Sequence, residues 1–187
     1  MIGAQLECSR DFLADKFIND AKERPKPLYV IAFRNGSEMR QVAPLWKGEA
    51  VQLGGLVLES ESGRFMAIDL SARNLNHVVA HEYSHVLLNS SGEPLPLWLQ
   101  EGLAEVFAAS VTGESDTFES RPLAETIPAT RLLSLREDSR EYNEQAFHAA
   151  FYHEVSVTAE YLWMDPEHKK RLLTYLELTR GGVSRSR

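Results

Sequence analysis

The spacing of apolar and polar positions divides the chain into a first part rich in strands and a second part rich in helices. Apolar residues run together in Leu28–Phe33, which predicts a buried strand. Two further strands are predicted at Val51–Leu58 and Arg64–Leu70, and the four residues Ser60–Gly63 between them suit a hairpin connection. We therefore expect a small sheet before residue 71.

Helical spacing dominates the remainder, because apolar residues recur there at intervals of three and four. The predicted helices are Asp11–Ala21, Ser37–Val42, Asn74–Ser90, Leu95–Ser110, Ala129–Glu137, Glu141–Met164 (one long helix or two joined ones) and Glu167–Thr179. A turn at residues 91–94, a polar loop at 113–122 and a loose tail at 181–187 separate or follow them. Strands first and helices second predict an α+β fold rather than an alternating α/β one.

The length of 187 residues fits one domain with two lobes, a β-rich lobe at 1–90 that ends in a helix and a helical lobe at 91–187. With 20 basic and 27 acidic side chains, the net charge of −7 is unsuited to nucleic acid. Apolar runs are far shorter than the roughly 18 residues of a membrane span. Cys8 is the single cysteine, which excludes an internal disulfide and a cysteine-rich metal site.

The segment His81-Glu82-Tyr83-Ser84-His85 carries the clearest chemical pattern. A spacing of four places both imidazoles on one helix face, with about 5–6 Å between the Cβ atoms, so that both can bind one metal ion. Glu82 flanks that face and is placed to take a proton from water on the metal. The alternative is an exposed helix with two surface histidines.

His77 lies four residues before His81, in the same helical register. Three ligands along one straight helix span about 12 Å and cannot share one ion. We therefore expect His77 at the surface or in contact with a ligand rather than on the metal.

A third ligand must come from elsewhere, and Glu93, Glu101 and Glu105 are the candidates. Glu101 is favoured by its depth. His85 lies about 7.5 Å before the end of the first helix, and Glu101 lies about 7.5 Å after the start of the next, so two antiparallel helices would hold both residues at the same level. One turn deeper, Glu105 suits an acceptor for the ring N–H of His81, with a solvated helix charge as the alternative. The expected cofactor is one zinc ion per chain.

The same residues resemble a known family. His81–His85 followed by Pro96-Leu97-Trp98-Leu99-Gln100-Glu101-Gly102-Leu103-Ala104-Glu105 is similar to the gluzincin metallopeptidases, and most closely to the compact bacterial peptidase MA-like domains such as DUF1570. The resemblance implies a zincin-like fold, with a small mixed N-terminal sheet, an active-site helix and a C-terminal helical subdomain. It also implies zinc at His81, His85 and Glu101, with Glu82 as general base.

Members of this family often carry export signals or further domains. Residues Met1–Arg10 show no basic start followed by an apolar stretch, so no signal peptide is predicted. The sequence leaves the location open, and a trimmed domain of an exported bacterial protein is compatible with it. The spacing from His85 to Glu101 is shorter than in the large aminopeptidases of the clan, so an exopeptidase activity is not implied.

Two further parts of the site are predicted upstream and downstream of the metal helices. The double glycine in Gly54-Gly55-Leu56 would let a substrate backbone come close and add as a strand, although a plain bulge is equally compatible. The segment Phe151–Ser156, followed by Tyr161-Leu162, resembles the family segment that implies Tyr152 as the donor to the oxyanion. The alternatives are another residue of the same helix (Tyr142, His148, His153 or Tyr161) and a purely structural Tyr152.

Together these features predict a zinc metallopeptidase, of the endopeptidase kind, acting on peptide or protein substrates. Three alternatives remain open from sequence. The first is a zincin-like binding or scaffold module that cleaves nothing, the second a structural zinc site in an unrelated helical domain, and the third a hydrolase of non-peptide amides or esters. Retention of Glu82 argues against the first, because a purely structural site has no use for that carboxylate.

Overall fold

The small mixed sheet and the helices around it are shown by a computed structural model that describes residues 2–17, 26–89, 94–113 and 126–180. Within these ranges the fold is α+β with helices predominating, which confirms the predicted class. The predicted turn at 91–94, the polar loop at 113–122, the tail at 181–187 and the end of the first predicted helix fall wholly or largely outside the described residues.

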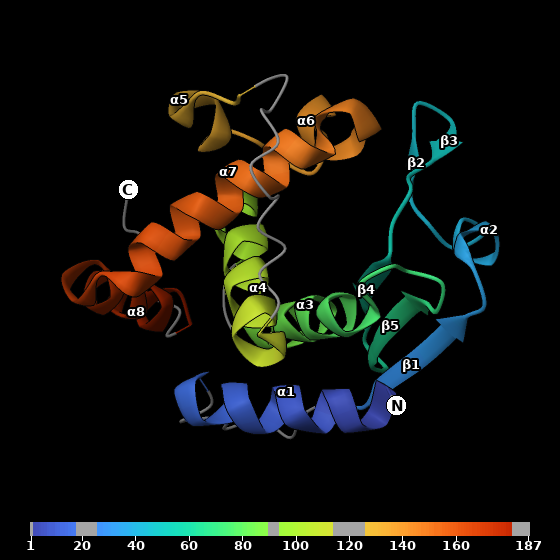
Figure 1. Ribbon diagram of the computed structural model, residues 1–187, viewed down its shortest axis with the longest axis horizontal. Helices are drawn as coiled ribbons and strands as arrows, with labels where there is room; N and C mark the ends of the chain where they lie inside the picture. Colours follow the sequence, from blue (N-terminus) through green and yellow to red (C-terminus); the bar gives the residue numbers. More distant parts are fainter. Residues whose placement is uncertain (1, 18–25, 90–93, 114–125, 181–187) are drawn as a thin grey trace.

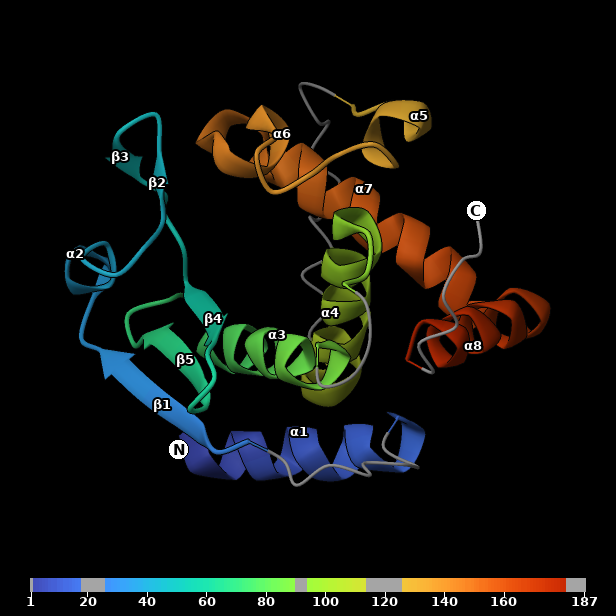
Figure 2. The same ribbon diagram turned by 180° about the vertical axis from the view of Figure 1, so that it is seen from behind.

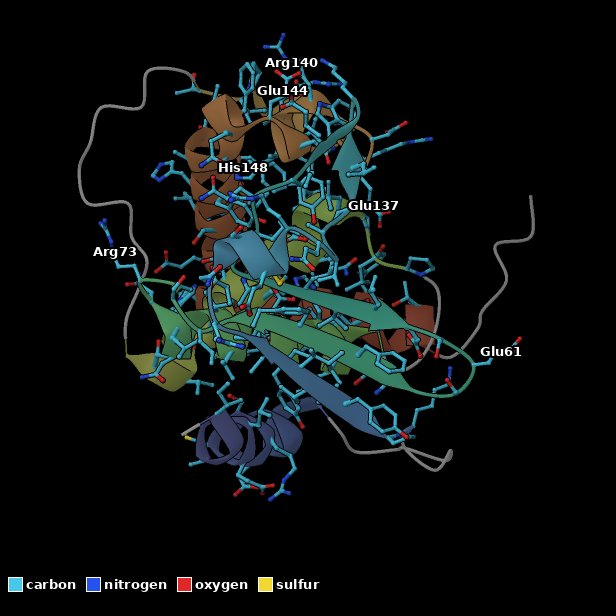
Figure 3. The ribbon with its side chains drawn as sticks, turned by 90° about the vertical axis from the view of Figure 1, so that its right-hand side faces the viewer. Glu61, Arg73, Glu137, Arg140, Glu144 and His148 are labelled. Atoms are coloured by element: carbon cyan, nitrogen blue, oxygen red, sulfur yellow. The ribbon has the colours of Figure 1, made fainter. Side chains whose placement is uncertain are left out.

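The sheet has the strand order β1 (Leu28–Phe33), β5 (Arg64–Asp69) and β4 (Gly55–Glu59). β1 runs parallel to β5 and β4 antiparallel to it, so the predicted hairpin through Ser60–Gly63 is confirmed. β4 begins four residues later than predicted. As an edge strand, it lies on the side of the sheet that faces α6 and α7 (Figure 3).

The prediction that β1 is buried is wrong. Tyr29 and Ile31 are 50% and 46% exposed, whereas Met66 and Ile68 of the neighbouring β5 are fully buried. β1 lies at the sheet edge, and its apolar residues point alternately to two faces of which neither is fully covered in the described structure. An apolar run alone cannot distinguish a central strand from such an edge strand.

A second, two-stranded sheet was not predicted. It pairs β2 (Leu45–Trp46) with β3 (Glu49–Ala50). Lys47 and Gly48 connect them, both with positive φ (51° and 87°), as tight hairpin turns require. Strands of two residues are too short to give a recognisable alternation.

The helices occupy the rest of the described chain. They are α1 (Ile2–Phe17), α2 (Gly36–Met39), α3 (Leu75–Leu88), α4 (Leu97–Thr112), α5 (Ala129–Leu132), α6 (Arg140–Asn143), α7 (Gln145–Met164) and α8 (Pro166–Arg180). α1 begins nine residues before the predicted start, and α5 ends five residues before its predicted end. The predicted segment Glu141–Met164 is two helices, α6 and α7, separated at Glu144. No helix of the described ranges is long and apolar enough to cross a membrane.

α4 is the central helix of the molecule. It contacts α3 on one side and α7 on the other, while α1 packs on α3 (Figures 1 and 2). A cluster of buried side chains joins α3 to the sheet through Met66, Ile68, Val79 and Val86. Around α4, apolar residues such as Leu103 and Phe107 form a separate buried cluster with α7 and α8.

Gly102 allows α7 to approach α4 closely. A Cβ atom at this position would lie 2.5 Å from the carbonyl oxygen of Val155 and 2.7 Å from the Cβ of Ala159. Both are on α7, and the first is a backbone atom that cannot rotate away. The glycine that follows Glu101 in sequence therefore fixes how near the α7 side chains come to α3 and α4.

We expect Gly102→Ala to destabilise the protein, although alanine has the higher helix propensity by about 1 kcal/mol. The overlap with α7 should cost about 1–3 kcal/mol and outweigh that gain. Urea unfolding measures the difference. Gly3→Ala in α1 is the matched control, because its new Cβ would meet nothing within 4 Å. Equal stability of the two variants would contradict the close approach.

Candidate metal centre

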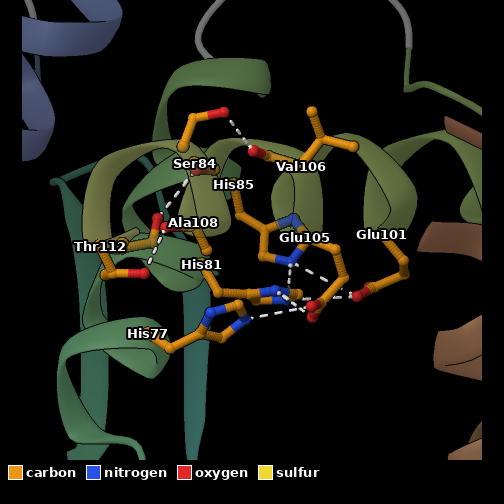
Figure 4. A network of polar contacts seen from close by, with 11 residues as sticks. His77, His81, Ser84, His85, Glu101, Glu105, Val106, Ala108 and Thr112 are labelled. Atoms are coloured by element: carbon orange, nitrogen blue, oxygen red, sulfur yellow. Dashed lines mark hydrogen bonds and ion pairs between the residues drawn. The ribbon is translucent and has the colours of Figure 1, made fainter. Parts of the chain in front are cut away.

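Three side chains from α3 and α4 bring their donor atoms together in the core. The Nε2 atoms of His81 and His85 are 3.0 Å apart, and the Oε2 atom of Glu101 lies 3.3 Å from the first and 3.6 Å from the second. All three residues are buried. Figure 4 shows both rings, on α3, turned toward the glutamate on α4. This group could hold a metal ion.

Each of the three side chains also has a partner on its far side. Nδ1 of His81 lies 2.8 Å from Oε1 of Glu105, where the sequence placed an acceptor for this ring. The hydroxyl of Tyr142 donates to Oε1 of Glu101 at 3.2 Å. The amide group of Gln100 lies 3.3 Å from Nδ1 of His85. These contacts leave Nε2 of each ring and Oε2 of Glu101 directed at one point.

The charges of this group stabilise one another. Burial alone would raise the pKa of Glu101, but the rings of His85 and His81 outweigh it and hold that pKa far below its usual range. Burial alone would likewise lower the pKa of His81, but Glu105 and Glu101 outweigh it and raise that pKa well above the usual value. A proton and a metal ion therefore compete for His81.

The prediction that His77 lies at the surface is wrong, and the alternative, a place behind the candidate metal ligands, describes its position better, because its contact is with Glu105. His77 is buried, and its Nε2 lies 3.0 Å from Oε2 of Glu105, the residue that contacts His81 through its other oxygen. His77, His81 and Glu105 form a second group of side chains with converging donor atoms.

Glu82 lies beside the metal group, buried against β4. Burial raises its pKa, although the rings of His81 and His85 partly oppose the shift. Gly55 makes this position possible, because a Cβ there would overlap the Glu82 side chain and lie 2.7 Å from Oε1. Gly54 similarly accommodates Val78, whose methyl group would lie 3.2 Å from an added Cβ. The two glycines therefore make room for side chains of α3, a role that was not predicted from the sequence.

A cleft of about 880 Å³ opens onto these residues. One wall is formed by Gly54 and the β4 residues Gly55 and Leu56, so the predicted substrate strand borders the cleft. The opposite wall comes from α6 and α7, and His148 of α7 is seen above the sheet in Figure 3. The volume is in the range typical of ligand sites.

The five candidate donors of the segment Glu141–Met164 divide into two sets. Tyr142, His148 and Tyr152 line the cleft, whereas His153 is not among its lining residues and Tyr161 is 63% exposed beside His168. The rings of Tyr152 and His81 have centroids 6.2 Å apart. The contact of Tyr142 with Glu101 was missed, since it depends on how α6 folds back over α4 and no local pattern records that.

Comparisons with protein-family models, with curated proteins and with solved structures found no match to this chain.

Acid should destabilise the metal-free protein through Glu105. Burial alone would raise its pKa, but His81 and His77 outweigh burial and hold it at about 2. The unfolded chain takes up the proton first, near pH 4.3, so the stabilisation by ionised Glu105 is present above that pH and lost as pH falls toward 2. We expect the free energy of unfolding, measured with urea in the presence of a chelator, to fall between pH 5 and pH 3 by about 1–3 kcal/mol more in the wild type than in Glu105→Gln.

Glu61→Gln, which removes an exposed carboxylate from the hairpin turn, is the control and should keep the wild-type pH dependence. Parallel pH curves for Glu105→Gln and the wild type would contradict the prediction.

Proposed function

We propose that the chain is a zinc-dependent metallopeptidase. The observation that carries the proposal is the triangle of donor atoms from His81, His85 and Glu101, with sides of 3.0, 3.3 and 3.6 Å. Zinc bonds of about 2.0–2.1 Å in tetrahedral geometry place ligand atoms about 3.3 Å apart. Two histidines and one glutamate, with a cleft beside them, are the ligand set of catalytic zinc sites, which keep a fourth position for water or substrate.

When bound, zinc supplies a Lewis acid that polarises the substrate carbonyl and makes water more acidic. Glu82 then accepts a proton from the attacking water and delivers it to the leaving nitrogen of the peptide. Its carboxylate suits this task because burial raises its pKa toward neutrality, where a general base is most effective. Packing against Gly55 restricts the side chain to the cleft side of α3.

The substrate is an extended peptide that pairs with the free edge of β4. The amide of Asp69 donates to the carbonyl of Gly54 at 2.8 Å, so residues 54, 56 and 58 direct their main-chain groups toward β5. The alternation directs those of Gly55 and Val57 to the free edge, toward the cleft. We therefore assign the main-chain contacts to Gly55 and Val57, while Leu56 contributes its side chain to the wall.

Tyr152 is the donor to the oxyanion in this proposal. Among the described residues, none hydrogen-bonds to its hydroxyl, whereas the hydroxyl of Tyr142 already donates to Glu101. Burial, together with Glu101, raises the pKa of Tyr152 well above its usual value and keeps the hydroxyl protonated. His148 suits the role less, because burial lowers the pKa of its ring and disfavours the form in which both ring nitrogens can donate.

We expect the purified chain to bind one zinc ion. His81→Ala and Glu101→Ala should abolish tight binding, since each removes a ligand. Glu105→Ala should keep zinc but weaken its binding about 10- to 100-fold, because it removes only the support of a ligand. Elemental analysis and competition with a chromogenic chelator measure both quantities. Complete zinc loss in Glu105→Ala with retention in Glu101→Ala would reverse the assignment.

Glu82→Gln tests the reaction. The variant has the same size without the base, so zinc content should be unchanged while cleavage of a quenched fluorescent peptide falls by at least about 10²-fold. Glu61→Gln, a carboxylate remote from the cleft, serves as control and should match the wild type. Wild-type turnover by Glu82→Gln would exclude the mechanism, and zinc binding without cleavage by the wild type would favour the binding module.

A further inference from the structure

We propose that His77 is a positioning residue that acts on the zinc ligand His81 through Glu105. The inference rests on the proposed zinc site and adds a residue that contacts the partner of a zinc ligand. Its basis is an uninterrupted chain of contacts: Nε2 of His77 lies 3.0 Å from Oε2 of Glu105, and Oε1 of Glu105 lies 2.8 Å from Nδ1 of His81. Figure 4 shows dashed lines from both rings to this carboxylate.

The burial of His77 determines which of its nitrogens carries the proton. Its side chain is only 5% exposed, and its Nδ1 is buried without a hydrogen-bond partner among the described residues. A proton on Nδ1 would leave a buried donor unsatisfied, which is costly. A proton on Nε2 instead meets a carboxylate, which only accepts. We therefore place a proton on Nε2, with His77 donating to Glu105.

This donor restrains both ends of the carboxylate. With Oε2 of Glu105 held by His77, the side chain cannot turn, and Oε1 stays in position to accept the Nδ1–H of His81. That hydrogen bond in turn leaves the lone pair of His81 on Nε2, the atom that faces His85 and Glu101. Partners that orient a metal ligand in this way commonly change metal affinity by about 10- to 100-fold.

Two other roles for His77 predict different results. Because His77, His81 and Glu105 also converge, they could hold a second metal ion, and the chain would then bind two. Because His77 borders the cleft, it could contact substrate, and zinc affinity without substrate would then be independent of it.

The test is a matched pair of amide variants. The side-chain nitrogen of His77→Gln reaches about as far as Nε2 of the ring and can donate to Glu105, whereas the shorter His77→Asn cannot. We expect zinc affinity, measured by chelator competition, to stay within about threefold of the wild type in His77→Gln and to fall about tenfold in His77→Asn. In the zinc-bound protein, the Nδ1–H proton resonance of His81 should exchange with water faster in His77→Asn.

A double-mutant cycle is completed by making the same two substitutions in the Glu105→Ala variant. If His77 acts through Glu105, both substitutions should leave zinc affinity unchanged there. Equal losses in both backgrounds, or two zinc ions per chain with one lost in His77→Asn, would overturn the proposal. None of these measurements depends on hydrolysis. If the variants behave as expected but the protein cleaves no peptide, only the proposed peptidase function is overturned. If zinc binds and His77 changes nothing, this inference fails alone; if no zinc binds, both fail.

Discussion

The contact between α3 and α4 buries a group of ionisable side chains, and the rest of the structure depends on satisfying them. Its members are His77, His81, Glu82, His85, Glu101 and, less completely, Glu105. An ionised side chain in the core is destabilising by several kcal/mol unless it is paired. Alternation of rings from α3 with carboxylates from α4 supplies the pairing. The contacts that hold these helices together are therefore also the contacts that aim the donor atoms that could hold a metal ion.

Two glycines set the distance between this polar core and the walls of the cleft. Gly55 allows β4 to lie against Glu82, and Gly102 allows the backbone of α7 to lie against α4. A side chain at either position would push a wall outward, and with it the edge of β4 or the hydroxyl of Tyr152. Close packing transmits such shifts over several residues, so the candidate metal donors and the walls of the cleft are adjusted together.

Sequence reasoning was effective where structure is local. His81 and His85 share a face because of helical spacing, and Glu101 reaches them because two helices joined by a short segment have matched depths. The features it missed depend on tertiary packing. Whether β1 is buried depends on which faces the helices cover, and the contact of Tyr142 with Glu101 joins residues that lie 41 positions apart in the sequence. The reason for Gly55 likewise became visible only with Glu82 placed against it.

Stability does not explain the buried position of Glu82, whereas the proposed function gives it a role. Burial raises its pKa, so at neutral pH the ionised form is disfavoured in the folded state relative to the unfolded one, and folding is opposed by that difference. The metal donors alone do not require it, since Glu101 already supplies the carboxylate among them. A glutamine would fill the same space beside Gly55 without a charge. An ionisable group kept at such a cost, beside a cleft and next to donor atoms that could hold a metal ion, is typical of functional sites and supports the proposed role of Glu82 in proton transfer.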